Sequence, residues 1–122
     1  ETSLSTREFV YYSFYNRIHQ KIEMLWPPIL REKLSGLNQK KIVSPRETVD
    51  IVVLMNRKGV IEQIEIVEQS RLRELDSSAI EAFNRAGPFF NPPPGIVDRD
   101  GFIRMKWGFV LYTGRLVKYG PP

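Results

Sequence analysis

The feature that most constrains the fold is a long alternation of apolar and other residues near the carboxy-terminal end, from Phe102 to Tyr112. A repeat of two residues is that of a β-strand, whose side chains point in turn to opposite faces. One face holds the bulky apolar residues Ile103, Met105, Trp107, Phe109 and Leu111. We therefore expect a strand whose aromatic face is buried beneath other elements.

A second alternating segment, Thr48–Met55, is followed by the turn sequence Asn56-Arg-Lys-Gly59. Glycine adopts positive φ values without steric cost, which suits a tight connection between antiparallel strands. The segment Val60–Gln69 then returns along the first strand, with Ile64 and Ile66 expected to be buried. The two segments predict a β-hairpin.

The amino-terminal part of the chain has instead the spacing of an amphipathic helix, from Arg7 to Trp26. Its apolar residues recur at intervals of three and four, and they are Tyr11, Phe14, Tyr15, Ile18, Ile22, Leu25 and Trp26. Pro27 and Pro28 are expected to end this helix, because proline lacks an amide hydrogen and restricts the residue before it. A second, short helix is expected from Ile29 to Leu34.

Another main helix is predicted around Leu75–Phe83, where small and apolar residues recur at helical spacing. Asp76 is of the residue type that caps a helix start, and Gly87-Pro88 ends the helical pattern.

The order of these elements predicts a single α+β domain over residues 1–122. In this fold a three-stranded antiparallel sheet is packed on one face by two main helices. Residues 113–114 are expected to form a turn, and residues 115–119 are the candidate for a short fourth strand that folds back on the last one. Residues 1–6 and 120–122 are expected to be flexible.

Composition removes several classes of function. The chain has no cysteine, which excludes disulfide frameworks, thiolate metal sites and cysteine nucleophiles. The net charge of +4 is spread thinly along the sequence, which favours a solubilising surface over a site for an anionic partner. The chain lacks a stretch of about 18 apolar residues and begins without methionine. We therefore expect part of a longer protein whose targeting segment lies upstream.

Candidates for catalysis or metal binding are weak. His19 is the single histidine and has no Cys, Asp or Glu at ligand spacing. Asp98–Gly101 begins like a calcium loop but is not followed by the later ligands. Glu62, Glu65 and Glu68 fit the solvent-facing side of a strand. We expect no enzyme activity, no cofactor and no metal.

These features occur in the same order as in the TonB carboxy-terminal family, which the chain resembles from about Tyr11 to Tyr112. The shared pieces are the aromatic-proline pair Trp26-Pro27, the hairpin turn Arg57–Val60, the helix start Ser70–Asp76, and Pro88-Phe89 before a run of prolines. Two places differ from the family pattern. Trp26 stands where tyrosine is usual, and Gln69-Ser70-Arg71 replaces serine-serine-glycine.

The resemblance implies a non-enzymatic, periplasmic domain of an energy transducer of Gram-negative bacteria. An upstream anchor in the inner membrane would connect it to motor proteins that supply force. Family members bind an extended segment of an outer-membrane receptor, or of another envelope protein, by adding that segment as a strand to the sheet. A homodimer is a further expectation that the sequence leaves open.

The last strand is the natural place for such a contact, because an edge strand exposes unpaired backbone groups. The predicted partner-binding residues are Arg104, Met105, Lys106, Trp107, Gly108, Phe109 and Val110. Arg104 and Lys106 are expected to attract acidic residues that flank the docked segment. The resemblance adds Trp26 and Pro27 as a second contact region. If residues 113–119 pair with the last strand, they cover this edge.

Two other functions remain as alternatives. A TolA-like adaptor in motility, secretion or envelope integrity would keep the fold and bind a different periplasmic protein. A more remote alternative is an RNA-binding module, because Lys106–Tyr112 resembles the aromatic strand of the RRM family, whose exposed rings stack on bases. The alternation places Trp107 and Phe109 on the face expected to be buried, so no nucleic-acid partner is expected.

Overall fold

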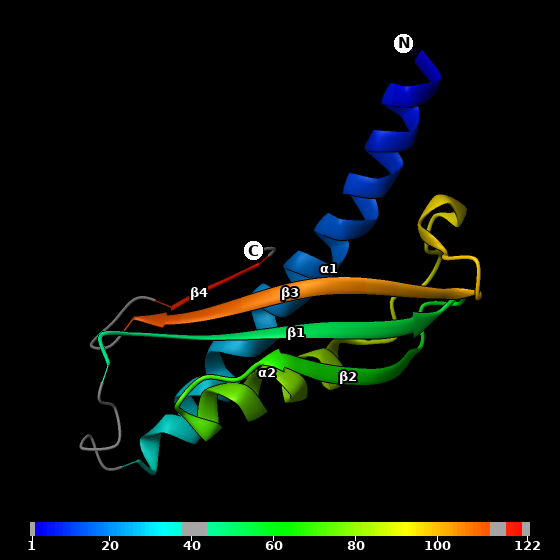
Figure 1. Cartoon of the computed structure of the whole chain (residues 1–122). Helices are drawn as coiled ribbons and strands as arrows, with labels where there is room; N and C mark the ends of the chain where they lie inside the picture. The colour runs from blue at the N-terminus through cyan, green and yellow to red at the C-terminus, as the bar shows by residue number, and fades with distance from the viewer. Residues whose placement is uncertain (1, 38–43, 113–116, 121–122) are drawn as a thin grey trace.

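The computed structural model describes residues 2–37, 44–112 and 117–120 of the chain. Its elements, in chain order, are α1 (Thr2–Ser35), β1 (Arg46–Asn56), β2 (Ile61–Glu68), α2 (Arg73–Ala86), the 3₁₀ helix η2 (Pro94–Ile96), β3 (Phe102–Tyr112) and β4 (Val117–Gly120). Within this part of the chain the strands form one antiparallel sheet in the order β2-β1-β3-β4. Both α-helices lie on the same face of the sheet (Figure 1). The predicted α+β fold is confirmed, including a short fourth strand.

The chain ends, for which flexibility is expected, lie partly within regular elements. Residues 2–6 belong to the first turns of α1, and Gly120 belongs to β4. Residues 1, 121 and 122 lie outside the described part, as do residues 113–116 of the predicted turn and fourth strand.

The centre of the sheet is the pairing of β1 with β3, which runs from Arg46 opposite Tyr112 to Asn56 opposite Phe102 without a register shift. The alternation predicted for both strands is confirmed, because their apolar faces are buried against the helices. Each large apolar side chain that is fully buried stabilises the folded state by about 1.5–3 kcal/mol. The interface between the sheet and the helices therefore holds the domain together.

The first helix is longer than predicted. α1 continues through Pro27 and Pro28, so the predicted break and the separate helix at 29–34 are wrong. A proline inside a helix costs about 3 kcal/mol through its missing hydrogen bond and its ring. Three side chains beside the pair have at most 5% of their surface exposed: Trp26, Ile29 and Leu30. Their burial, at about 1.5–3 kcal/mol each, offsets the cost and keeps this segment helical.

The second helix begins earlier than predicted. α2 starts at Arg73, so Asp76 lies inside its first turn and does not cap it. The Asp76 carboxylate instead accepts hydrogen bonds from the backbone N–H of Ser70 at 3.1 Å and from the Ser70 hydroxyl at 2.6 Å. Asp76 therefore fixes the loop that leads into the helix.

The hairpin turn between β1 and β2 is fastened to the segment that follows α2. Gly59 has a φ of 85°, in the left-handed region that glycine adopts without strain. Its carbonyl accepts a hydrogen bond from the N–H of Phe89 at 2.9 Å. A β-carbon at Gly59 would lie 1.7 Å from the Phe89 carbonyl oxygen, so any other residue would force one of the two segments to move.

Replacing Gly59 by alanine should therefore destabilise the domain. The positive φ alone costs a non-glycine residue about 1–3 kcal/mol, and displacing the buried Phe89 adds to this. Gly95→Ala is the matched control, because open space surrounds the position of its β-carbon and its φ lies outside the left-handed region. Its effect should stay within about 0.5 kcal/mol. Denaturant unfolding of both variants measures the difference, and equal stabilities would contradict the close contact.

Candidate strand-docking site

β2 forms one outer edge of the sheet, and its pairing with β1 is irregular. Two bulges interrupt the pairing, with Glu62 and Val67 as the extra residues. Bulges of this kind twist an edge strand away from flat pairing geometry and protect it from further strands. The prediction that Ile66 is buried is wrong, because this residue lies beside the second bulge and has 36% of its surface exposed.

The outer edge of β3 has a different form. β4 pairs with it from Gly108 to Leu111. On the same side, the segment Phe102–Trp107 has no strand beside it among the described residues. We call this segment the open edge. Because β3 pairs with β1 without a register shift, the open edge carries no bulge. The backbone N–H and carbonyl of Phe102 already bond Asp100 and Asp98, so the outward-facing backbone groups after Phe102 are the ones that another extended chain can join.

The edge residues predicted from the sequence lie on β3, and the end of β4 divides them into two groups. Those in the open edge are Arg104, Met105, Lys106 and Trp107. The others, Gly108, Phe109 and Val110, pair with β4. The backbone of β3 is therefore free to accept a strand over the first group and is already paired on both sides over the second.

Arg104 already has acidic partners within the domain. Its guanidinium contacts Asp98 Oδ2 at 2.9 Å and Asp100 Oδ2 at 2.7 Å. The hydrogen bond from Arg104 holds the pKa of the Asp100 carboxyl below its usual range. A partner's acidic residue would compete with these two carboxylates for Arg104, and the expected role of Arg104 in attracting such a residue stays a prediction. Lys106 is exposed, and the described residues give it no acidic partner, so it is the cation available for that contact.

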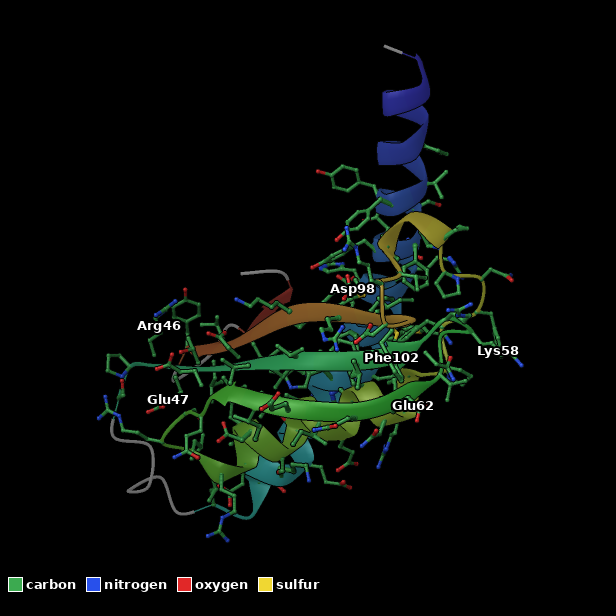
Figure 2. All side chains as sticks on the ribbon, turned by 45° about the vertical axis from the view of Figure 1, so that its right-hand side comes forward. Arg46, Glu47, Lys58, Glu62, Asp98 and Phe102 are labelled. Atoms are coloured by element: carbon green, nitrogen blue, oxygen red, sulfur yellow. The ribbon has the colours of Figure 1, made fainter. Side chains whose placement is uncertain are left out.

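The amino-terminal half of α1 extends past the sheet on the side of the open edge (Figure 1). We call this part of the helix the overhang. Figure 2 shows Asp98 and Phe102 at the end of the sheet nearer the overhang, and Arg46 and Glu47 at the opposite end. An open hollow of about 490 Å³ lies on the overhang, lined by Tyr11, Tyr12, Tyr15, Asn16 and His19.

Aromatic contacts connect this hollow to β3. The Tyr15 ring stacks on Trp107 with 5.0 Å between ring centroids, and the Tyr11 ring lies 5.8 Å from that of Tyr15. The His19 ring lies 6.2 Å from Trp107. Burial, with a smaller effect of Tyr11, raises the pKa of the Tyr15 hydroxyl from 10.0 to about 12. Trp107 is the last residue of the open edge, so the hollow lies beside the place where the free backbone ends.

The aromatic-proline pair, in contrast, is not a surface feature. Trp26 has no exposed surface, and its ring lies 4.8 Å from that of Phe109. Its indole Nε1 donates a hydrogen bond to Ser78 Oγ at 2.8 Å. Pro27 is half-buried within α1. Because the helix continues through Pro27, residue 26 faces the sheet, and the Trp26 ring that was expected to contact a partner is buried.

The structure also bears on the other chemistries considered. The described residues contain no group of three or more His, Cys, Asp or Glu side chains placed to hold a metal ion. None of the helices in that part of the chain is long and apolar enough to cross a membrane. The rings of Trp107 and Phe109 are fully buried, so they are not available to stack on bases as the RNA-binding alternative requires.

No protein-family model, curated protein or solved structure matches the chain. The resemblance to the TonB carboxy-terminal family therefore rests on the residue pattern alone.

Sequence reasoning missed the hollow. It assigned Tyr11 and Tyr15 to the face of the helix that packs on the sheet, but 41% of the Tyr11 surface is exposed. The sequence held a signal for it, because a further tyrosine, Tyr12, stands directly after Tyr11. In the structure Tyr12 is 64% exposed. Consecutive helical residues point about 100° apart, and Tyr12 lies outside the predicted apolar stripe that includes Tyr11, so aromatic surface was to be expected beside the stripe.

The buried state of Tyr15 predicts a loss of stability at alkaline pH. Below pH 10 the Tyr15 hydroxyl is protonated in both the folded and the unfolded chain. As the pH rises from 10 to 12 the unfolded chain loses this proton first, so the free energy of unfolding falls. Because Tyr15 is partly exposed, solvent screening reduces the size of this fall.

Titration of tyrosinate absorbance, together with denaturant unfolding, tests this expectation. Tyr15→Phe should remove the step near pH 12 and reduce the fall in stability between pH 10 and 12. Tyr12→Phe is the control, since it removes a hydroxyl from an exposed ring and should leave that step in place. If Tyr15→Phe removes a step near pH 10 instead, the burial of this hydroxyl is wrong.

Proposed function

We propose that this domain is a non-enzymatic binding module that takes up an extended segment of another protein by strand addition at the open edge, Phe102–Trp107. The observation that carries the proposal is the half-covered edge of β3, because β4 occupies Gly108–Leu111 and, among the described residues, no strand lies beside Phe102–Trp107. β4 already pairs with part of this side of β3. A docked segment would pair with the remaining part, in line with β4.

The two edges of the sheet support this choice. β2 has two bulges and three exposed glutamates, Glu62, Glu65 and Glu68, which are common protections of an edge against further pairing. The open edge has regular pairing on its other side, and its exposed Lys106 has no acidic partner in the described part of the chain. A docked strand would gain several backbone hydrogen bonds of about 0.5–1.5 kcal/mol each, from which the cost of ordering the segment is subtracted.

The cellular role that we propose is that of the periplasmic domain of a TonB-like energy transducer. Its partner would be an outer-membrane receptor or another envelope protein, and an upstream anchor would connect it to motor proteins of the inner membrane. Strand addition suits the transmission of force. A load that runs along the docked strand shears several backbone hydrogen bonds together, so the contact resists pulling even where its affinity is modest. A TolA-like adaptor would use the same edge, and the identity of the partner separates these two roles.

A peptide titration followed by NMR tests the proposed strand addition. The probe is a peptide of about eight residues that alternates threonine and valine, with an acidic residue at each end. Backbone amide signals of Phe102–Trp107 should shift, while those of Ile61–Glu68 on the bulged edge should not. Because backbone hydrogen bonds carry the contact, binding should weaken little with added salt.

N-methylated peptides provide the control for backbone pairing. Along a strand, alternate residues direct their N–H groups to the same neighbour. Of two peptides methylated at alternate amides in the two possible phases, one should therefore lose binding and the other should keep it. If both bind as well as the unmodified peptide, the contact does not depend on backbone hydrogen bonds and strand addition is wrong.

A further inference from the structure

We propose that the hollow on the overhang is the specificity pocket of the open edge, and that it selects an uncharged aromatic side chain of the docked segment. This inference rests on the proposed strand addition, and it names the side chain that the site prefers.

The direction of the docked side chains follows from the sheet. A strand added to β3 lies about 4.8 Å beyond it, on the side where α1 extends past the sheet. Residues directly opposite each other on paired strands point to the same face. Met105 and Trp107 are buried on the helix side, so the residues that pair with them point toward α1. Every second side chain of the docked segment is therefore directed at the overhang.

A row of aromatic rings leads from β3 to the place where such a side chain arrives. Tyr15 stacks on Trp107 at 5.0 Å, and Tyr11 continues the row at 5.8 Å from Tyr15. The β-carbon of a residue opposite Trp107 would stand about 4.5–5.5 Å from that of Trp107, further out from the sheet. An aromatic ring at this position would contact the exposed surface of the row formed by Trp107, Tyr15 and Tyr11, of which Tyr11 is 41% exposed.

The chemistry of the lining sets the preference. Three tyrosines and a histidine present ring surfaces, Asn16 presents an amide, and no Lys, Arg, Asp or Glu is among the described lining residues. A charged side chain would lose hydration there and would meet no opposite charge among these residues. An aromatic side chain would gain about 0.5–1.5 kcal/mol from ring contacts beyond its burial. Tyr11 and Tyr12 still expose 41% and 64% of their surfaces, so area remains for a ligand to cover.

A scan of substituted peptides tests the preference. In the threonine–valine peptide, phenylalanine or aspartate replaces each position in turn, and affinity is measured from the amide shifts of Phe102–Trp107. Phenylalanine should tighten binding about two- to tenfold, and only at alternate positions, because only these point toward α1. Aspartate at the same positions should weaken binding.

Protein variants connect this preference to the hollow. Tyr11→Ala and Tyr12→Ala, made singly, should reduce the ratio of the affinities for the phenylalanine-substituted and the unsubstituted peptide, and each variant supplies this ratio from its own two titrations. Phe9→Ala is the matched control, since Phe9 is 71% exposed on the same overhang but does not line the hollow. It should keep the advantage. Thermal unfolding of each variant verifies that the fold is retained.

The outcomes separate the two proposals. If the unsubstituted peptide binds but phenylalanine gives no advantage, or Phe9→Ala removes as much of it as Tyr12→Ala does, the specificity pocket is wrong and strand addition stands. If no peptide of the series shifts the amides of Phe102–Trp107, strand addition itself is wrong, and the specificity pocket with it.

Discussion

The rest of the structure depends on the burial of two aromatic residues of β3, Trp107 and Phe109, against both helices. Phe83 of α2 meets both rings edge to face, at 5.5 Å from Trp107 and 6.1 Å from Phe109. From α1, Trp26 contacts Phe109 at 4.8 Å and Tyr15 stacks on Trp107 at 5.0 Å. Two contacts about three turns apart on one helix fix the direction in which α1 crosses the sheet. That direction places the amino-terminal turns of α1 beyond β3.

Tryptophan at position 107 leaves a buried polar atom without a hydrogen bond, and the ring contacts of this residue explain why it is tolerated. Its indole Nε1 is buried and finds no acceptor among the described residues, which costs about 1–3 kcal/mol. Phenylalanine would avoid this cost, but its smaller ring would have to give up part of the contact with Phe83 on one side or with Tyr15 on the other. The larger indole spans both. We infer that the penalty is tolerated because Trp107 holds α1 in place over the sheet edge.

The parts of the fold that the sequence predicts are those governed by neighbouring residues. The strand Phe102–Tyr112 has the predicted bounds, because alternation is a local signal that long-range contacts reinforce. The errors occur where distant contacts decide. Packing of its neighbours against the sheet keeps the Pro27-Pro28 segment helical, and Asp76 is drawn from its expected capping role to Ser70. The candidate site is predicted only in part for the same reason, since its limits depend on where β4 ends and how far α1 projects.

The overhang follows from the dimensions of these elements. A helix of 34 residues is about 51 Å long, whereas four strands at about 4.8 Å spacing cover a width of only about 14 Å between the outer strand axes. A helix that crosses such a sheet must project past an edge, and here it projects past the edge whose segment Phe102–Trp107 has no bulge and, among the described residues, no strand beside it. Backbone pairing along that segment would accept many sequences, because every residue offers the same amide and carbonyl. A side-chain pocket on the projecting helix is the simplest means by which such a site could distinguish one extended segment from another.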